Sequence, residues 1–353
     1  MDFAFVLCDH TGKPLPGSHL GQRRRLVYAL NRAVEAQLTY SAQDEATGRT
    51  RDALRNGIPQ LKVYRDGDLD LTGHWHPMRL QGSADEQSTM DLVFRDAYGE
   101  LAYRYLRADI QFVAEDVGQM IVALIGTTNA LSDTTLRVDS VETTIARDQT
   151  FEAGKNHSEA GIQLTELDGG PDFECIPLDP QERDDGVTGA LRIVRSLGQE
   201  RSTAKFEFGP ETLANLKGYE STVQRPVNRV LGIGSGEPPL RSEPNDAASE
   251  ALYRSQMKFV ANSDLTTQQV LADKTAAELR PSPSWITQIT PDPAMAPMFG
   301  TDFQMGDTVP VNIRDGEIEL SLMARVVRVE IGLGDSNEIQ DYIVGFDTEG
   351  ENV

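Results

Sequence analysis

The hydrophobic positions of the first hundred residues alternate with polar ones in short runs, and turn-forming residues separate these runs. Residues 61–64 and 69–75 are two such runs, and Arg65-Asp66-Gly67-Asp68 lies between them. An Asp-Gly pair between two β-rich runs is typical of a hairpin turn, because both positions tolerate a positive φ. Another run spans residues 90–94. The pattern predicts an antiparallel barrel or sandwich in this region.

The pattern changes to a helical one after residue 107. Apolar residues then recur at spacings of three and four, which places them on one face of a helix over residues 109–125. These residues are Ile110, Val113, Val117, Met120, Ile121 and Leu124. Asp109 is expected to cap this helix and Gly126 to end it. A second helix is predicted over residues 156–167, before Asp168-Gly169-Gly170-Pro171.

The rest of the chain reads as strands with one more helix. Strands are predicted over residues 173–176, 191–194 and 204–208, which gives the middle of the chain an α+β character. A strand over 227–233 leads into a Pro-rich segment, 237–246, that is expected to be an exposed loop. A helix is predicted from Asp264, its expected cap, to Arg280, where Pro281 and Pro283 end it. The last strands are expected at 308–313, 318–331 and 342–346, with an Asp315-Gly316 turn.

Length and composition indicate a folded chain of several domains. The chain has 353 residues, of which 39% are hydrophobic and 25% charged, so two to four small cores are expected and wholesale disorder is not. The formal net charge is −22, which disfavours tight binding to nucleic acid or to anionic membranes. Two explanations of this charge stay open: solubility alone, or an acidic lining of a passage through which DNA slides.

The cysteines and the N-terminus give no sign of a secretion route or of membrane insertion. Cys8 and Cys175 are isolated and fit neither a disulfide framework nor a zinc site, so a reducing compartment during folding is expected. The apolar N-terminus lacks a basic segment and turns polar at Asp9, so no signal peptide is predicted. No apolar run reaches the ~18 residues of a membrane span.

Two motifs suggest ligand binding but lack the context that it needs. Gly232-Ile233-Gly234-Ser235-Gly236 follows a predicted strand, but Glu237-Pro238-Pro239 stands where the helix of a phosphate-binding loop would begin. His74-Trp75-His76 places two imidazoles on one face of an extended segment, yet His10, His19 and His157 show no ligand spacing with it. A glycine-rich strand exit and a pair of hydrogen-bonded histidines are therefore the expectations.

The other candidates are also better explained by structure than by chemistry. Asp66, Asp68 and Asp70 lack the twelve-residue calcium loop and its terminal glutamate, so a hairpin turn is expected. The basic run Arg23-Arg24-Arg25 is expected to form ion pairs rather than to bind phosphates. The candidate stacking aromatics, Trp75, Trp285, Tyr103 and Tyr105, are expected to be core or interface anchors. No nucleophile elbow or zinc-protease helix is present, so no catalytic, cofactor-binding or metal-binding residue is predicted.

The order of several segments resembles that of the tail-tip hub, or minor tail, proteins of long-tailed bacteriophages. The family is similar in fold to the baseplate hub of contractile phages and to the N-terminal part of tail-associated lysins. The segments that carry the resemblance follow one another over most of the chain. They are residues 61–67 with 92–101, 108–110 with 147–152, 170–174 with 196–198 and 206–209, 227–234, and 303–309 with 324–329.

The resemblance implies a mainly β fold with an α+β middle domain. It implies two β-barrel-like tube domains with peripheral domains outside them. The expected division is 1–105 for the first tube domain, 106–220 for the middle region, and 221–353 for the second tube domain, with a loop and helix inserted at about 237–285. Three copies then present six tube domains around a channel, which suits a six-fold tail tube.

The resemblance also implies a role and partners. The chain is expected to be a homotrimeric structural protein of the virion, made in the host cytoplasm, that joins the distal tail protein to tip or fibre proteins. Its channel would hold the end of the tape-measure protein and then pass DNA, without specific nucleic-acid binding, a cofactor or membrane insertion. The alternatives are a receptor- or glycan-binding tail module, which predicts Trp75 or Trp285 in an open groove, and a cell-wall hydrolase component.

Overall fold

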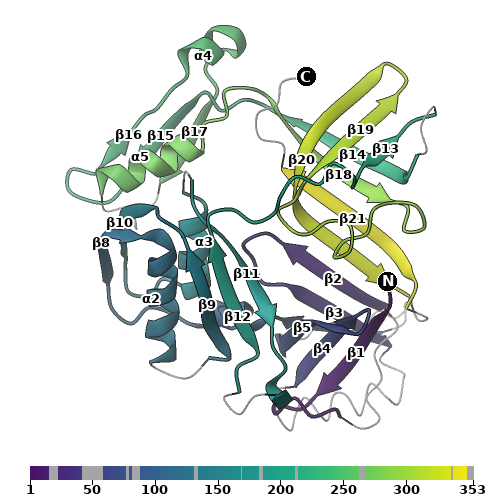
Figure 1. The fold of residues 1–353 in the computed structure, drawn as a ribbon. Coiled ribbons are helices and arrows are strands. Elements are labelled where there is room, and N and C mark those ends of the chain that lie inside the picture. The colour runs from purple at the N-terminus through teal and green to yellow at the C-terminus, as the bar shows by residue number, and fades with distance from the viewer. Residues whose placement is uncertain are drawn as a thin grey trace.

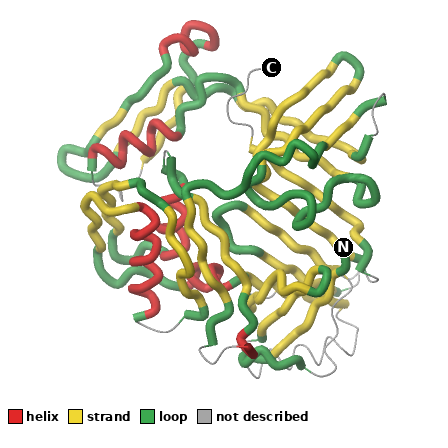
Figure 2. The backbone as a smooth tube through the Cα atoms, viewed as in Figure 1, coloured by secondary structure: helices red, strands yellow, loops and turns green. Residues whose placement is uncertain are grey.

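The computed structural model describes most of the chain and shows a mainly β protein (Figures 1 and 2). The described residues are 1–15, 23–41, 59–76, 79–81, 88–130, 134–167, 169–182, 186–210, 214–261, 267–334 and 337–347. A large sheet occupies one side of the molecule, and two smaller units with the longer helices lie on the other (Figure 1).

The N-terminal strands form six neighbouring members of the large sheet and carry one short extra strand. They are β1(Phe3–Cys8), β2(Arg23–Ala29), β3(Glu35–Ser41), β4(Gln60–Arg65), β5(Asp68–Trp75), β6(Arg79–Gln81) and β7(Thr89–Arg95). The predicted hairpin is β4–β5, and Asp66 and Gly67 at its turn both have positive φ, 53° and 94°. Alternate residues of β3 and β7 are buried, as expected for strands that cover a core with one face.

The C-terminal strands form the other half of the same sheet. They are β13(Phe206–Phe208), β14(Leu216–Gln224), β18(Ser284–Pro291), β19(Thr308–Asp315), β20(Ile318–Leu333) and β21(Ile339–Asp347). The predicted turn at Asp315-Gly316 joins β19 to β20. Asn215, directly before β14, is hydrogen-bonded to Glu207 of β13. Its backbone N–H donates to the Glu207 carbonyl over 3.0 Å, and its side-chain oxygen accepts from the Glu207 N–H over 2.9 Å.

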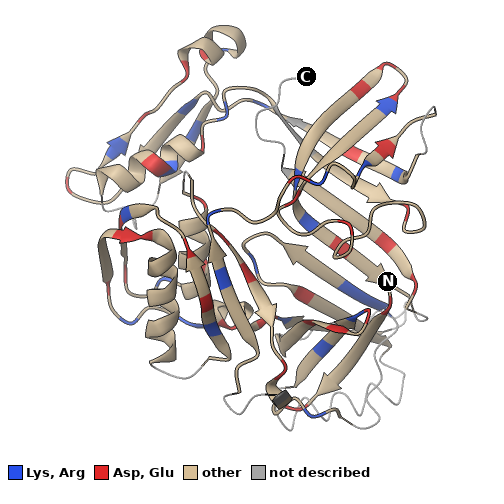
Figure 3. Cartoon of the chain, in the orientation of Figure 1, with Lys and Arg blue, Asp and Glu red and all other residues tan. Residues whose placement is uncertain are grey.

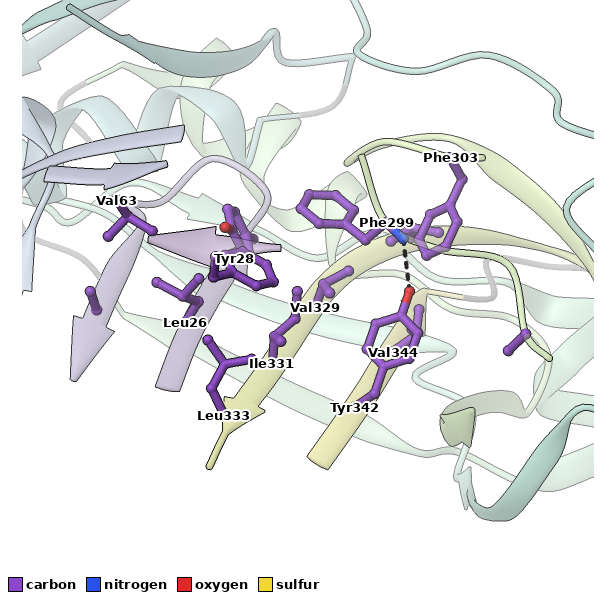
Figure 4. Close-up of a cluster of buried hydrophobic side chains, with 14 of the residues drawn as sticks. Leu26, Tyr28, Val63, Phe299, Phe303, Val329, Ile331, Leu333, Tyr342 and Val344 are labelled. Atoms are coloured by element: carbon purple, nitrogen blue, oxygen red, sulfur yellow. Dashed lines mark hydrogen bonds between the residues drawn. The ribbon is translucent and has the colours of Figure 1, made fainter. Parts of the chain in front are cut away.

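The two halves are joined by antiparallel pairing of β2 with β20, from Arg24 opposite Leu333 to Ala29 opposite Arg328. The sheet order is β1-β4-β5-β7-β3-β2-β20-β21-β18-β14, and within the described residues the pairings close no ring of strands. One hydrophobic core spans both halves. Figure 4 shows Leu26 and Tyr28 of β2 beside Val329 and Ile331 of β20, with the Phe299 N–H donating to the Tyr342 hydroxyl.

The middle of the chain forms a second core of helices and small sheets. Its elements are the 3-10 helix η1(Ala97–Tyr103), β8(Ile110–Asp116), α2(Val117–Asn129), β9(Leu136–Glu142), β10(Ala146–Phe151), α3(His157–Thr165), β11(Asp172–Pro177), the 3-10 turn η2(Pro180–Glu182) and β12(Gly189–Val194). α3 confirms the helix predicted over residues 156–167, and Asn156 is its cap.

The helix predicted over 109–125 is wrong in its first two turns and in both ends. Residues 110–116 form β8, which pairs with β10, and the helix begins at Val117 with Asp116 as its cap. Gly126 lies inside α2, which continues to Asn129. The spacing of Ile110, Val113 and Val117 suited a helix, but Val113 is 68% exposed on β8, because pairing with a distant strand overrode the local pattern.

A third unit is a small sheet covered by one helix. Its elements are β15(Arg229–Ile233), β16(Arg241–Ser242), α4(Ala247–Tyr253), β17(Met257–Ala261) and α5(Gln268–Ala277), and the strand order is β16-β15-β17. The segment predicted as loop therefore contains β16. The helix before Pro281 is confirmed, but its cap is Thr267, and the expected cap Asp264 lies outside the described residues.

The fold confirms the expected class, mainly β with an α+β middle. The division at residues 105 and 220 stays a prediction. Within the described residues, no helix is long and apolar enough to cross a bilayer.

Candidate functional site

The face of the large sheet that points away from the core carries a network of paired charges at the joint between the two halves. It holds Arg25 of β2 and Arg328 and Glu330 of β20, and both arginines contact the one carboxylate. Arg95 of β7 pairs with Glu35 of β3 over 2.9 Å. Burial opposes ionisation of Glu330, but hydrogen bonds from the two arginines outweigh it and lower its pKa. Of the basic run, Arg25 forms the expected ion pair, with Glu330.

An open groove of about 450 Å³ lies on this face where β2 meets β20 and β21. Arg23, Thr39, Gly332 and Asp341 are among the residues that line it. Arg24 points to the opposite side, is 4% exposed, donates to the Gly334 carbonyl over 2.6 Å and lies over the Phe5 ring. Adjacent residues of the basic run therefore point to opposite faces of β2.

A second cavity, of about 560 Å³, lies where the two sheet halves meet the middle unit. At its edge Asp172 of β11 accepts hydrogen bonds from the Leu197 N–H over 2.7 Å and the Asn31 side chain over 3.0 Å, and it contacts Arg325 of β20. Nearby, Asp307 accepts from the Gln199 N–H over 2.7 Å. These bonds hold the middle unit against both halves of the sheet. Sequence reasoning missed this junction, since its members lie far apart in the chain.

The two histidines of His74-Trp75-His76 bind protein groups. His74 contacts Thr188 over 2.6 Å through Nε2 and Glu100 over 3.2 Å through Nδ1. His76 Nδ1 lies 2.7 Å from the Tyr103 hydroxyl. Burial lowers the pKa of His76 to about 4 and also lowers that of His74, against the carboxylate of Glu100. The described residues contain no cluster of three metal-ligating side chains.

The set Thr188, His74 and Glu100 places a hydroxyl, an imidazole and a carboxylate in line, as acyl-transfer enzymes do. Thr188 is 1% exposed and His74 6%, so a substrate has no access to the hydroxyl. The three residues come from the middle unit, β5 and η1, and they join these elements. We assign the set a structural role.

The acidic and glycine-rich motifs also have structural roles. Asp66 accepts from the Asp2 N–H over 2.7 Å, and Asp70 pairs with Arg65 over 2.6 Å. Gly232 lies against α5, where a Cβ atom would come within 2.3 Å of Thr275. The close packing against α5 therefore explains why residue 232 is a glycine, and no phosphate ligand is needed to explain it.

The aromatic candidates fall into two groups. Trp75 is half-buried and packs against the main core, while the side chain of Trp285 lies outside the described residues. Tyr103 and Tyr105 are exposed, 54% and 57%, and Tyr105 borders a groove of about 290 Å³. Both tyrosines are exposed in the single chain, so they are not core residues, and the expectation that they are interface anchors stays a prediction. Tyr103 is the last residue of η1, and Tyr105 lies in the connection between η1 and β8.

Comparison with solved structures identifies the class of fold. No protein-family model matches the sequence, and no curated protein is similar to it. A tail protein from Neisseria meningitidis superposes with a TM-score of 0.59 at 14% identity, covering 99% of this chain and 98% of that one. The 43 kDa tail protein of prophage MuSo2 from Shewanella oneidensis gives a TM-score of 0.55 at 14% identity, covering 97% of both chains.

A component of the type VI secretion system of E. coli, described as similar to phage tail proteins, gives a TM-score of 0.53 at 10% identity over 99% of this chain and 78% of that one. The chain therefore has the fold of phage tail proteins and their secretion-system counterparts. The resemblance seen in the sequence is confirmed at the level of the fold.

Proposed function

We propose that this protein is a structural component of a phage tail tip, a homotrimeric hub that joins the distal tail protein to tip or fibre proteins. It is a virion protein made in the host cytoplasm, with no enzymatic activity. Residues 1–105 and 221–353 would supply the two tube domains of each copy, and 106–220 the middle region. The observation that carries the proposal is the likeness to tail proteins over nearly the whole length of both chains.

The large sheet supports a ring assembly through its edges. Eight strands follow one another in the order β6-β7-β3-β2-β20-β21-β18-β14, and every neighbouring pair is antiparallel. In the described part of the chain, β6 pairs only with β7 and β14 only with β18. Because β6 and β14 run in opposite directions, β14 of one copy can pair antiparallel with β6 of the next, beside the branch of the sheet that continues from β7 to β1. A cyclic assembly would cover both edges, which otherwise promote aggregation.

The uncovered face of this sheet suits a passage for the tape-measure protein and then DNA. Three of its arginines are engaged by carboxylates of the same face, Arg95 by Glu35 and both Arg25 and Arg328 by Glu330, which weakens their attraction for a passing phosphate. Figure 3 shows basic residues on β2 and acidic residues on β21, and β20 carries both. On such a face DNA would bind weakly because the arginines are already paired with carboxylates. The net negative charge of the whole chain would not be the cause.

The mass of the purified protein in solution tests the proposal. Light scattering on a size-exclusion column should give three times the 38.8 kDa of one chain. A monomer or a hexamer at every protein concentration would contradict the hub assignment. Zymography on host peptidoglycan tests the absence of enzymatic activity, and clearing that disappears on substitution of one carboxylate would establish a hydrolase instead.

A further inference from the structure

The small sheet leaves one of its faces uncovered. α5 packs on the other face, where Val230 is fully buried, Gly232 touches the helix, and the Ser242 and Thr275 hydroxyls lie 2.8 Å apart. Residues of β15 and β17 that are paired in register share a face, so Leu231 and Phe259 lie together on the side away from α5.

This uncovered face is apolar and exposed. Phe259 is 59% exposed and Met257 55%. In α4, which precedes β17, Leu252 is 78% exposed. Large apolar side chains gathered on adjacent elements mark an interaction surface in a soluble protein. We call Met257, Phe259, Leu231 and Ile233 the apolar face.

The basic residues on this side of the sheet are arginines of β15 and β16. Arg229, in register with Met257, is paired with Glu243 and Glu250. Arg241 of β16 lies opposite Ile233, on the same side of the sheet, and is exposed. An acidic, partly apolar surface is therefore the complement of this face.

The hairpin between β19 and β20 is such a surface. Ile318 at its tip is 54% exposed, and Asp315, Glu317 and Glu319 beside it are exposed too. Tyr219 and Arg314 contact Asp315 and Glu319 respectively. The hairpin and the small sheet lie on opposite sides of the molecule (Figures 1 and 3), so they can meet only between copies.

We propose that the β19–β20 hairpin of one copy docks on the apolar face of a second copy, with Ile318 against Phe259 and Glu317 near Arg241. The contact joins two different surfaces, as every contact in a cyclic trimer does. This inference rests on the proposed homotrimer and names one of its interfaces.

Paired cysteines test the contact directly. The double variant Phe259→Cys with Ile318→Cys should form covalent dimers and trimers under mild oxidation, while each single variant should not. The matched control pairs Ile318→Cys with Val113→Cys, because Val113 is an apolar residue 68% exposed on β8. The native Cys8 and Cys175 interfere little, since burial raises the pKa of both thiols.

Charge exchange gives a second readout that does not depend on oxidation. Arg241→Glu should raise the dissociation constant of the assembly roughly tenfold, and adding Glu317→Arg should restore most of the loss. If the wild type is a trimer but the 259–318 pair cross-links no better than the control, the docking is wrong and the hub proposal stands. A monomeric wild type removes the hub proposal and this contact together.

Discussion

At the scale of single residues, Asp172 is the carboxylate that holds three parts of the chain together. It is 5% exposed and receives hydrogen bonds from Asn31 near β2 and from the Leu197 N–H, besides the contact with Arg325. Asn31 in turn accepts from the Phe173 N–H over 2.8 Å. Breaking a buried charged contact leaves the remaining partners unsatisfied, which costs more than a surface ion pair contributes.

The substitution Asp172→Asn should lower the free energy of unfolding by about 2 kcal/mol, because Arg325 loses its counter-charge. Urea unfolding followed by circular dichroism measures it. The control is Glu174→Gln on the same strand, since Glu174 pairs with Arg192 with both side chains about two-fifths exposed. That change should cost less than ~1 kcal/mol, and an equal loss in both variants would contradict the assigned role.

His76 should make the protein less stable in acid. Its pKa lies at about 4 in the fold, mainly because of burial and also because of Arg95, whereas the ordinary pKa of a histidine is 6.5. The unfolded chain therefore takes up the proton first, and the stability contributed by the neutral imidazole is lost as the pH falls from 6.5 towards 4.

Asp96 acts in the opposite direction, because burial raises its carboxyl pKa to about 7. Its contribution to stability is present at low pH and is lost as the pH rises through 7.

Comparison of the wild type with His76→Gln isolates the contribution of the histidine. The unfolding free energy of the variant should fall less between pH 6.5 and 4 than that of the wild type. An NMR titration that places the His76 transition near 6.5 in the folded protein would refute the assignment.

At the scale of elements, the packing of α5 on β15 depends on Gly232. A Cβ atom there would lie 2.3 Å from Thr275 Cγ2 and 3.0 Å from Leu271 Cδ1, so the helix must move to admit it. The sequence showed only a glycine-rich strand exit at this place. The helix that requires the glycine lies some forty residues later and is brought there by tertiary packing.

Gly232→Ala should lower the free energy of unfolding by about 1–3 kcal/mol through overpacking. The control is Gly126→Ala in α2, an exposed site with no atom within 4 Å of the added Cβ. That change should raise the stability by about 0.5–1 kcal/mol, because alanine restricts the unfolded chain and favours the helix. Thermal unfolding of both variants decides the point, and two changes of the same sign would count against the packing described.

At the scale of the whole molecule, the pairing of β2 with β20 makes the first and last parts of the chain one folding unit. Leu26 and Ile331 face each other across this pair and are fully buried in one core. Long-range pairing of this kind gains its stability only after the intervening chain is in place.

A fragment of residues 1–105 should therefore not unfold cooperatively by itself, because it lacks β20 beside β2 and the core residues of the second half. Circular dichroism and urea unfolding of the fragment measure this against the full chain. A fragment with a sharp transition and dispersed amide signals would show instead that the first tube domain is an independent unit.

The sequence by itself determined the elements whose signals are local. The hairpin at Asp66-Gly67, the helix within residues 156–167 and the last strands follow from turn chemistry, the local sequence pattern and alternation, and these need no distant partner. The resemblance in segment order added the fold. Only the tertiary structure decided that residues 110–116 form a strand, that Arg325 meets Asp172, and that the uncovered apolar face lies on β17, because each depends on which remote segment packs alongside.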